Sequence, residues 1–353
     1  MMSNLPTYTG GWQRIGTGPE DGSSALTWNG IIPLPNLGPT EVLVKYHSRS
    51  MNYPEISIAN GTFPWRFPDR VVVPGSDGAG EVIGTGALVS SFTVGDKVIL
   101  QHYPGFHNGP APPNNQKIPG THMDGTLAGH GVWDQSALLP MPAYLTYEEA
   151  ATLPCSALTA WNCLFGLTPV KAGDYVLTQG SGGVSVFAIQ FALKAGAIVI
   201  ATTSSDEKSA KLRALGAQHV INYRAHPDWG VKAREIAKSR GGCQKVIDIG
   251  GAGTIDQSFK CVSRGGEISI VGFVTGGRYK DGPNLLSPLL QVCTVRGVEV
   301  GNRLQFEEMM QFMEAWKIRP VLEERRFALK DVKEAYKYFW KGSHVGKMVI
   351  TNS

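Results

Sequence analysis

The chain has 353 residues, 42% of them hydrophobic, which suits about two globular domains and argues against disorder. Its 33 Lys and Arg and 29 Asp and Glu residues are interspersed, so the net charge of +4 predicts neither a nucleic-acid nor a membrane partner. No apolar stretch approaches the roughly 20 residues that cross a bilayer, and Met1–Gly18 lacks the pattern of a secretory signal. Five cysteines at scattered spacings fit a reducing compartment, so we expect a cytoplasmic protein.

The N-terminal part of the chain alternates short strand patterns with turns rich in glycine and proline. The clearest strands are Glu41–His47, Gly80–Gly84 and Lys97–Leu100, and few helical patterns lie between them. This texture predicts a mainly antiparallel β domain.

A glycine turn follows the strand that begins at Val176 and leads directly into a predicted helix, Val184–Ala195. Gly180 permits the tight turn, Gly182 allows a pyrophosphate to approach the backbone, and the amides that open the helix face the phosphate with the positive end of the helix dipole. Ser185 stands where the usual motif has its third glycine, so the turn alone is a weak signal. The predicted phosphate-binding backbone comprises Gly180, Gly182, Gly183 and Val184.

After this turn, apolar strand patterns alternate with helical patterns, as a doubly wound parallel sheet requires. The strands are expected at Ile198–Ala201, His219–Ile221, Lys245–Ile249, Glu267–Val271 and Thr294–Val300, and the helices at Glu207–Leu215, Asp228–Ser239 and Ile255–Val262. We therefore expect one nucleotide-binding domain at residues 158–303.

The C-terminal tail contains two helical patterns, Gln305–Lys317 and Leu329–Lys341, and a final strand, Lys347–Ile350, with no partner strand nearby in the sequence. We expect the tail to fold back onto the N-terminal domain, so that residues 1–157 and 304–353 form one domain. The predicted fold class is α/β, with a mainly antiparallel β domain beside a doubly wound parallel sheet.

Several phrases, in this order and spacing, resemble the medium-chain dehydrogenase/reductase superfamily, which includes zinc alcohol dehydrogenases and zinc-free quinone and enoyl reductases. The phrases are VPGSDGAGEV (73–82), VGDKV (94–98), LPCSALTAW (153–161), the glycine turn, and HVGKMVI (344–350). The resemblance implies a GroES-like catalytic domain, a Rossmann domain, a nicotinamide cofactor, a small-molecule substrate and a homodimer.

The chain departs from the zinc enzymes of this superfamily at the metal ligands. Asn52 stands at the first ligand position, Ser76 replaces the histidine, Asp77 replaces the following glutamate, and only Cys155 remains. A catalytic zinc site wants about three protein ligands drawn from thiolate, imidazole and carboxylate, so we expect no metal. The alternative is a site built from loop histidines, but these lack compact ligand spacing: His102, His107, His122 and His130.

Asn52 and Tyr53 resemble the zinc-free quinone reductases, although Glu55 stands where those enzymes commonly carry aspartate. We expect Asn52 and Tyr53 to be catalytic, with Tyr53 as proton donor or substrate-orienting hydroxyl. The alternative is that Tyr53 only forms an apolar wall.

Cofactor choice depends on the end of the second Rossmann strand, where NAD enzymes place an acid on the ribose. We place that position at Thr203 and expect NADPH, with NADH less favoured because Asp206 lies close by. By resemblance, the phosphate-binding set comprises Ser204, Lys208 and Tyr223. An alternative interpretation is that Ser204 or Ser205 is the N-cap of the next helix. The two interpretations are compatible, because a serine can cap a helix and also contact a phosphate.

Further cofactor contacts follow from the resemblance. Thr159 matches a position beside the nicotinamide, Gly272, Phe273 and Val274 match the loop that carries its carboxamide, and Arg303 is a possible contact. Packing alone is the alternative explanation, especially for Phe273.

These residues predict a zinc-independent, NADPH-dependent oxidoreductase that transfers hydride to an activated double bond, as in an enone or quinone. One alternative is a carbonyl reductase or alcohol dehydrogenase that acts without zinc. An alternative of another class is a protein that binds NADPH without turnover, in a crystallin-like or regulatory role.

Overall fold

A computed structural model describes residues 5–68, 70–111, 118–276 and 286–352, and the chain divides into two compact units. The first unit comprises residues 1–156 and 302–353, and the second comprises residues 157–301. No helix in the described ranges is long and apolar enough to cross a bilayer.

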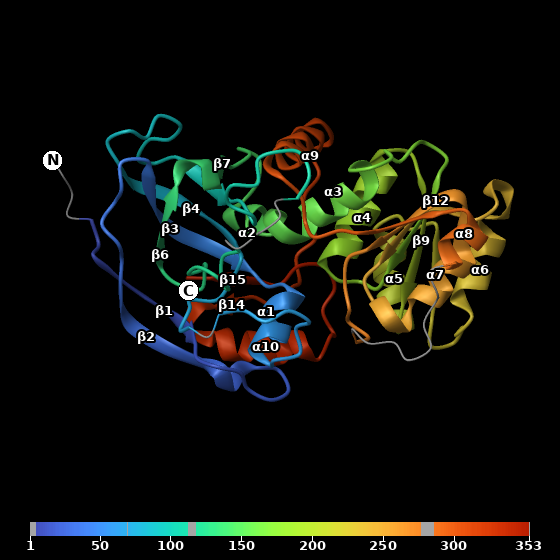
Figure 1. Ribbon diagram of the computed structural model, residues 1–353, viewed down its shortest axis with the longest axis horizontal. Helices are drawn as coiled ribbons and strands as arrows, with labels where there is room; N and C mark the ends of the chain where they lie inside the picture. The colour runs from blue at the N-terminus through green and yellow to red at the C-terminus, as the bar shows by residue number, and fades with distance from the viewer. Residues whose placement is uncertain (1–4, 69, 112–117, 277–285, 353) are drawn as a thin grey trace. The chain divides into compact units, whose positions relative to one another are not determined.

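The first unit is built on a seven-stranded sheet with a separate two-stranded ribbon (Figure 1). Its strands are β1 (Tyr8–Arg14), β2 (Leu26–Pro33), β3 (Glu41–Ser50), β4 (Asp77–Thr85), β5 (Lys97–Leu100), β6 (His130–Asp134), β7 (Leu138–Pro140), β14 (Phe327–Ala328) and β15 (Val349–Thr351). Its helices are α1 (Tyr53–Ala59), α2 (Tyr147–Ala150), α9 (Arg303–Trp316) and α10 (Val332–Trp340). The sheet order is β14-β15-β3-β4-β5-β7, with β6 paired to β3, and every pair except β14 with β15 is antiparallel.

The C-terminal strand confirms that the tail returns to the N-terminal sheet. β15 pairs antiparallel with β3, so that Val349 lies opposite Ser50. On its other edge β3 pairs with β4, and Ser50 lies opposite Asp77. Three strands that are far apart in the sequence therefore meet at one end of β3.

The second unit is a six-stranded parallel sheet with the order β10-β9-β8-β11-β12-β13, the doubly wound arrangement that the sequence predicts. Its strands are β8 (Tyr175–Gln179), β9 (Ile198–Thr203), β10 (His219–Asn222), β11 (Cys243–Asp248), β12 (Val262–Ile270) and β13 (Thr294–Gly297). Its helices are α3 (Leu158–Phe165), α4 (Gly183–Lys194), α5 (Asp206–Ala214), α6 (Trp229–Ile236), α7 (Ile255–Cys261) and α8 (Ser287–Gln291).

The apolar sequence of these parallel strands is explained by burial on the sheet faces. Leu177, Ile200 and Val246 are at most 1% exposed and pack in one core with Ala233 of α6 and Phe259 of α7. The fold class is therefore confirmed. Several elements differ from expectation, because β12 begins five residues before Glu267 and β13 ends at Gly297 rather than Val300.

Candidate active site

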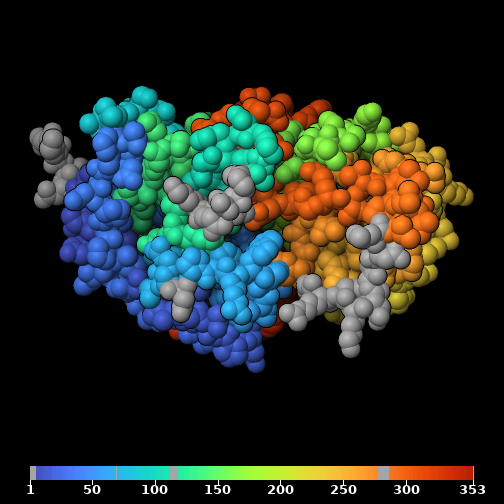
Figure 2. Space-filling model, viewed as in Figure 1, coloured from blue at the N-terminus to red at the C-terminus, as the bar shows by residue number. Residues whose placement is uncertain are grey.

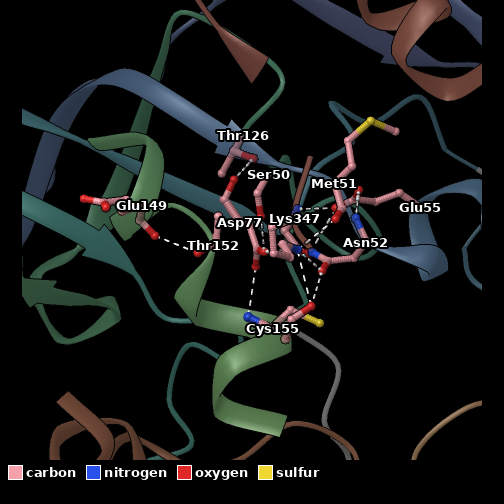
Figure 3. Close-up of polar contacts among 12 residues, drawn as sticks. Ser50, Met51, Asn52, Glu55, Asp77, Thr126, Glu149, Thr152, Cys155 and Lys347 are labelled. Atoms are coloured by element: carbon pink, nitrogen blue, oxygen red, sulfur yellow. Dashed lines mark hydrogen bonds and ion pairs between the residues drawn. The ribbon is translucent and has the colours of Figure 1, made fainter. Parts of the chain in front are cut away.

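The end of β3 leads into a buried polar cluster in the first unit (Figure 3). Ser50 ends the strand, Asn52 is the N-cap of α1, and Asp77 begins β4 on the neighbouring strand. Lys347 lies two residues before β15, which pairs with the other edge of β3. Each of these four side chains is at most 4% exposed, so their polar groups must find hydrogen-bond partners inside the protein.

The ammonium of Lys347 is the centre of this cluster. Its Nζ donates to Asn52 Oδ1 at 2.5 Å, to the backbone oxygen of Met51 at 2.8 Å, and toward Asp77 Oδ2 at 3.3 Å and Ser156 Oγ at 3.4 Å. A buried cation needs this many oxygen partners, because it has lost its hydration.

The carboxylate of Asp77 is fully committed to groups inside the protein. Oδ1 accepts the backbone N–H of Cys155 at 3.0 Å, and Oδ2 accepts the hydroxyl of Ser50 at 2.6 Å in addition to its contact with Lys347. The segment that carries Cys155 and Ser156 is thereby tied to the end of β4.

A second set of contacts surrounds Ser76, which precedes β4. Its backbone N–H and its hydroxyl both donate to Glu55 Oε1, at 3.0 and 3.1 Å, and its Oγ accepts a long hydrogen bond of 3.4 Å from Asn52 Nδ2. Glu55 Oε2 accepts the backbone N–H of Asn52 at 2.8 Å and completes a capping box on α1. Burial of the carboxyl is the main cause that raises the pKa of Glu55 to about 7.

These residues do not fit a catalytic zinc ion. Asn52 offers a neutral amide and Ser76 a neutral hydroxyl, and both oxygens of Asp77 are already hydrogen-bonded. Of the family's ligand positions Asn52, Ser76 and Cys155, only Cys155 carries a preferred donor type, its thiol. Within the described ranges no group of three or more His, Cys, Asp or Glu side chains is arranged to hold a metal, and the four loop histidines do not form one.

The structure places Tyr53 at the first residue of α1, next to Asn52. Its side chain is half-buried, and this burial raises the pKa of its hydroxyl. His102, which follows β5, is a further buried side chain near the cluster, because the charges of Asp77 and Lys347 both act on it. Burial lowers the pKa of His102 to about 4, so its imidazole is neutral at pH 7.

In the second unit, the glycine turn between β8 and α4 fits a dinucleotide phosphate. Gly180 has a φ of +78°, which favours glycine. Gly182 is the N-cap of α4, makes no side-chain cap hydrogen bond, and has nothing within 4 Å of the place where a Cβ would lie. Gly183 and Val184 open the helix. Open space beside the helix amides is what a phosphate requires.

The residues expected to select the cofactor gather after β9 and β10. Ser205, rather than Ser204, is the N-cap of α5 and accepts the backbone N–H of Lys208 at 3.3 Å. Tyr223 follows β10, is 40% exposed, and donates its backbone N–H to Thr203. The placement of the ribose contact at Thr203 needs correction, because this residue is only 1% exposed and its Oγ1 is buried. Ser204 is the next side chain along and is half-buried.

The other expected cofactor residues lie in different surroundings. Thr159 is buried in α3, and Gly272, Phe273 and Val274 follow β12. A Cβ on Gly272 would lie 2.4 Å from the backbone oxygen of Ile249, so close packing requires glycine there. Arg303 begins α9, and its guanidinium donates to Ser136 O, Leu138 O and Glu307. These contacts fasten α9 within the first unit, and the cofactor contact of Arg303 stays a prediction.

Sequence reasoning missed a polar network that joins β8 to β11. Gln179 Oε1 accepts the backbone N–H groups of Ile249 and Gly250 at 3.2 Å, and its Nε2 donates to Ser258 at 3.0 Å. Ser258 in turn donates to Asp248 Oδ2 at 2.6 Å. The sequence signal for this network was a polar residue at the carboxyl end of each of two apolar strands, Gln179 in β8 and Asp248 in β11.

Comparison with known proteins assigns the chain to a family. Residues 38–144 match the model of the alcohol dehydrogenase GroES-like domain, and residues 183–315 match that of the zinc-binding dehydrogenases. The zinc-type alcohol dehydrogenase-like protein C1773.06c of Schizosaccharomyces pombe is 41% identical over 322 residues, which cover 89% of this chain and 91% of that protein.

Two solved structures extend the comparison. An NAD-dependent alcohol dehydrogenase superposes with a TM-score of 0.85 at 29% identity, covering 97% of this chain and 99% of that one. The 2-octenoyl-CoA carboxylase reductase CinF, in complex with NADP and 2-octenoyl-CoA, superposes with a TM-score of 0.83 at 27% identity, covering 98% and 88%. The chain belongs to the medium-chain dehydrogenase/reductase superfamily and is an oxidoreductase. The alternative of a protein that binds a cofactor without turnover is therefore disfavoured.

Proposed function

We propose that this oxidoreductase is a zinc-independent, NADPH-dependent reductase of activated carbon–carbon double bonds, such as those of enones or quinones. The observation that carries the proposal is that Asn52 and Asp77, which stand in the family's metal-binding phrases, are hydrogen-bonded within the protein and share the buried ammonium of Lys347 as a partner. Ser76 and Asn52 supply neutral groups where metal enzymes of the family have ligands.

The donor set favours conjugate reduction over alcohol oxidation. Oxidation of an alcohol requires stabilisation of an alkoxide, which a metal ion does well. An enone or quinone is already polarised, so its reduction needs orientation and a hydrogen-bond donor or proton source. The likeness to CinF, whose structure contains NADP and an enoyl thioester, supports this choice.

NADPH, when bound, supplies the hydride. The residues that would hold it in the second unit are a threonine of α3, the glycine turn with its helix amides, a serine that precedes α5, a lysine of α5, and the aromatic and loop positions that follow β10 and β12. They are Thr159, Gly180, Gly182, Gly183, Val184, Ser204, Lys208, Tyr223, Gly272, Phe273 and Val274. Hydroxyl and ammonium groups at Ser204 and Lys208 would favour the 2′-phosphate of NADPH over NADH.

Asn52 and Tyr53 would orient the substrate. The only hydrogen bond that Asn52 Nδ2 makes to a described residue is the long one to Ser76 Oγ, at 3.4 Å. An amide nitrogen carries two donor hydrogens, so Asn52 has capacity to donate to a substrate carbonyl oxygen. Tyr53 would present its hydroxyl from the first turn of α1.

The test is the fate of the hydride. Stereospecifically deuterated NADPH is mixed with 2-cyclohexenone, a quinone, and the matching saturated ketone and aldehydes, and the products are examined by NMR. We expect deuterium at the β-carbon of the enone, in protein stripped of metal by a chelator and shown to be metal-free. Label on carbonyl carbon alone would instead establish the second candidate, a carbonyl reductase or alcohol dehydrogenase that acts without zinc. The similarity of this chain to alcohol dehydrogenases supports this second candidate.

We also propose that the protein is a cytoplasmic homodimer. None of the five cysteines, all of which lie in the described ranges, forms a disulfide, which suits a reducing compartment. Leu289 and Leu290 of α8 are 68% and 71% exposed, and the short strand β13 is the edge of its sheet. The orange segment that contains α8 and β13 reaches the surface in Figure 2. Exposed apolar side chains beside a sheet edge suit contact with a second copy.

A further inference from the structure

Glu55 is a buried carboxyl that contacts a hydroxyl inside the candidate site. It is 8% exposed, and Ser76, whose Oγ lies 3.1 Å from Glu55 Oε1, is 6% exposed. The capping box on α1 accounts for Oε2, which accepts the N–H of Asn52. It does not account for Oε1, which faces Ser76.

Glu149 provides a comparison within the same unit. It also completes a capping box, on α2, and it is also 8% exposed. Both of its oxygens accept hydrogen bonds from Arg319 Nη1, at 2.8 and 2.9 Å, so its negative charge is compensated. In the described part of the chain, no Lys, Arg or His nitrogen lies within ion-pair distance of Glu55.

The surroundings of Glu55 therefore favour the neutral form of its carboxyl more than solvent does for a glutamate on the surface. Asp77 on β4 adds a negative charge that raises its pKa further, Lys347 acts in the opposite sense, and the buried Tyr336 of α10 also interacts with it. Among the described hydrogen-bond partners of the Glu55 carboxyl, Ser76 Oγ is the one that can accept a proton, because the others are backbone N–H donors.

We propose that Ser76 is the catalytic proton donor of this reductase and that Glu55 is the positioning residue that holds and resupplies the proton. This inference rests on the proposed function. A neutral Glu55 donates its O–H to Ser76 Oγ, which leaves the Ser76 O–H directed away from Glu55 and available to a substrate. Tyr53 then orients the substrate and does not protonate it.

The step balances in protons and electrons. After hydride from NADPH has bonded to the β-carbon of an enone, the π electron pair resides on the α-carbon and carbonyl oxygen as an enolate. The Ser76 O–H bond breaks and its proton bonds to the α-carbon, while the Glu55 O–H bond breaks and its proton bonds to Ser76 Oγ. Glu55 is left as a carboxylate, and a solvent proton restores it before the next turnover.

The experiment compares two acceptors that differ in their need for a proton. Reduction of 2-cyclohexenone gives a basic enolate, whereas reduction of 1-nitrocyclohexene gives a nitronate that is stable in water. Positioned general acids contribute roughly 100- to 10,000-fold to rate, so we expect Glu55→Gln and Ser76→Ala to lower the ratio of enone to nitroalkene turnover by at least about 10-fold. Wild-type enone turnover should also fall as the pH rises through neutrality, more steeply than nitroalkene turnover.

Glu149→Gln is the matched control, since it removes the same type of capping carboxylate, and it should leave the ratio as in the wild type. Glu55→Asp should restore part of the ratio. Ser76→Ala keeps the test decisive if Glu55→Gln does not fold, because the cap on α1 does not involve the Ser76 side chain. Equal losses for both acceptors, or a ratio that falls in Tyr53→Phe instead, would overturn the relay alone. Absence of reduction of either acceptor by the wild type would overturn the proposed function and the relay together.

Discussion

Lys347 Nζ lies 3.3 Å from Asp77 Oδ2, and their side chains are 3% and 0% exposed. The two residues are 270 positions apart in the sequence and meet because β15 and β4 flank the same strand, β3. Burial of either charge alone would be costly, since its hydration is lost and nothing replaces it. The C-terminal segment is therefore coupled electrostatically as well as by strand pairing to the centre of the first unit.

Substitution of one partner should destabilise the protein strongly. We expect Lys347→Met to lower the free energy of unfolding by about 3–5 kcal/mol, because removal of one member of a buried pair leaves the other charge uncompensated. Chemical denaturation of Lys347→Met, Asp77→Asn and the double variant measures the coupling. The double variant should lose less than the sum of the single losses. Additive losses would show that the pair does not act as a unit.

The sequence predicted the parallel sheet and the pairing of the C-terminal strand with the N-terminal sheet well, because both show in local sequence patterns. Strands of β-branched residues followed by glycine turns identify β8 to β13, and a C-terminal strand without a neighbour must pair elsewhere. β1 and β2 escaped prediction because glycines interrupt both strands, Gly10 and Gly11 in β1 and Gly30 in β2, and because the exposed Trp28 breaks the alternation of a half-buried strand. α1 escaped because seven residues contain too few turns to show a period.

The sequence identified several residues of the candidate site but could not predict which of their side chains contact one another. Asn52 and Ser76 are visible as departures from a metal-binding pattern. The bond from Lys347 Nζ to Asn52 Oδ1 spans 295 positions, and no local pattern predicts it. The burial of Thr203 could not be predicted for a related reason: a strand's last side chain can point inward or outward, and only the register decides which.

The raised pKa of Glu55 predicts a pH-dependent stability. Its carboxyl has a pKa of about 7 in the folded protein against an ordinary value of 4.5, so between these pH values the folded state binds more protons than the unfolded state. Stability contributed by this group is present below pH 4.5 and is lost as the pH rises through about 7. At 1.36 kcal/mol for each pH unit, the loss is at most about 3 kcal/mol.

The measurement is the difference in unfolding free energy between wild type and Glu55→Gln at several pH values. We expect the variant to become more stable relative to the wild type as the pH rises from 5 to about 7.5, because glutamine does not ionise. The low pKa of His102 acts in the opposite sense, and subtraction of the two proteins cancels it. A difference that is independent of pH would contradict the burial of an ionisable Glu55.

Gly182 offers a clean test of cofactor binding. Its φ of −78° is open to any residue, and nothing lies within 4 Å of the place where a Cβ would be, so a side chain can begin there without a clash. We expect Gly182→Val to keep the melting temperature of the wild type and to weaken NADPH binding by roughly 10-fold or more, because a side chain would fill the space of the pyrophosphate. Calorimetric titration measures the binding. Gly30→Val is the control, because Gly30 is an exposed glycine of β2 without a positive φ and has only one atom, at 3.9 Å, near its Cβ position. Undiminished NADPH binding by Gly182→Val would show that the pyrophosphate does not bind at this turn.

Ser204→Asp should change the preferred cofactor. Ser204 is half-buried and precedes the N-cap of α5. An aspartate there would repel the 2′-phosphate of NADPH and accept hydrogen bonds from the ribose of NADH, so the ratio of kcat/KM for NADPH to that for NADH should fall by roughly 10- to 100-fold, which corresponds to about 1.4–2.7 kcal/mol. Thr203→Asp is the comparison, and it should lower stability instead, since it buries a carboxylate. If Thr203→Asp shifted the preference toward NADH and Ser204→Asp did not, the ribose contact would lie at Thr203.

Leu289 and Leu290 on α8 should determine the oligomeric state. Two leucines that are 68% and 71% exposed are unfavourable in a monomer, and a second copy would remove them from water. We expect the wild type to sediment as a dimer and the Leu289→Ser/Leu290→Ser variant to dissociate into monomers with an unchanged circular dichroism spectrum. Leu88→Ser, at an exposed leucine of the first unit, is the control, and it should leave the dimer intact. A wild-type monomer at micromolar concentration, or a dimer that survives the double substitution, would contradict this role for α8.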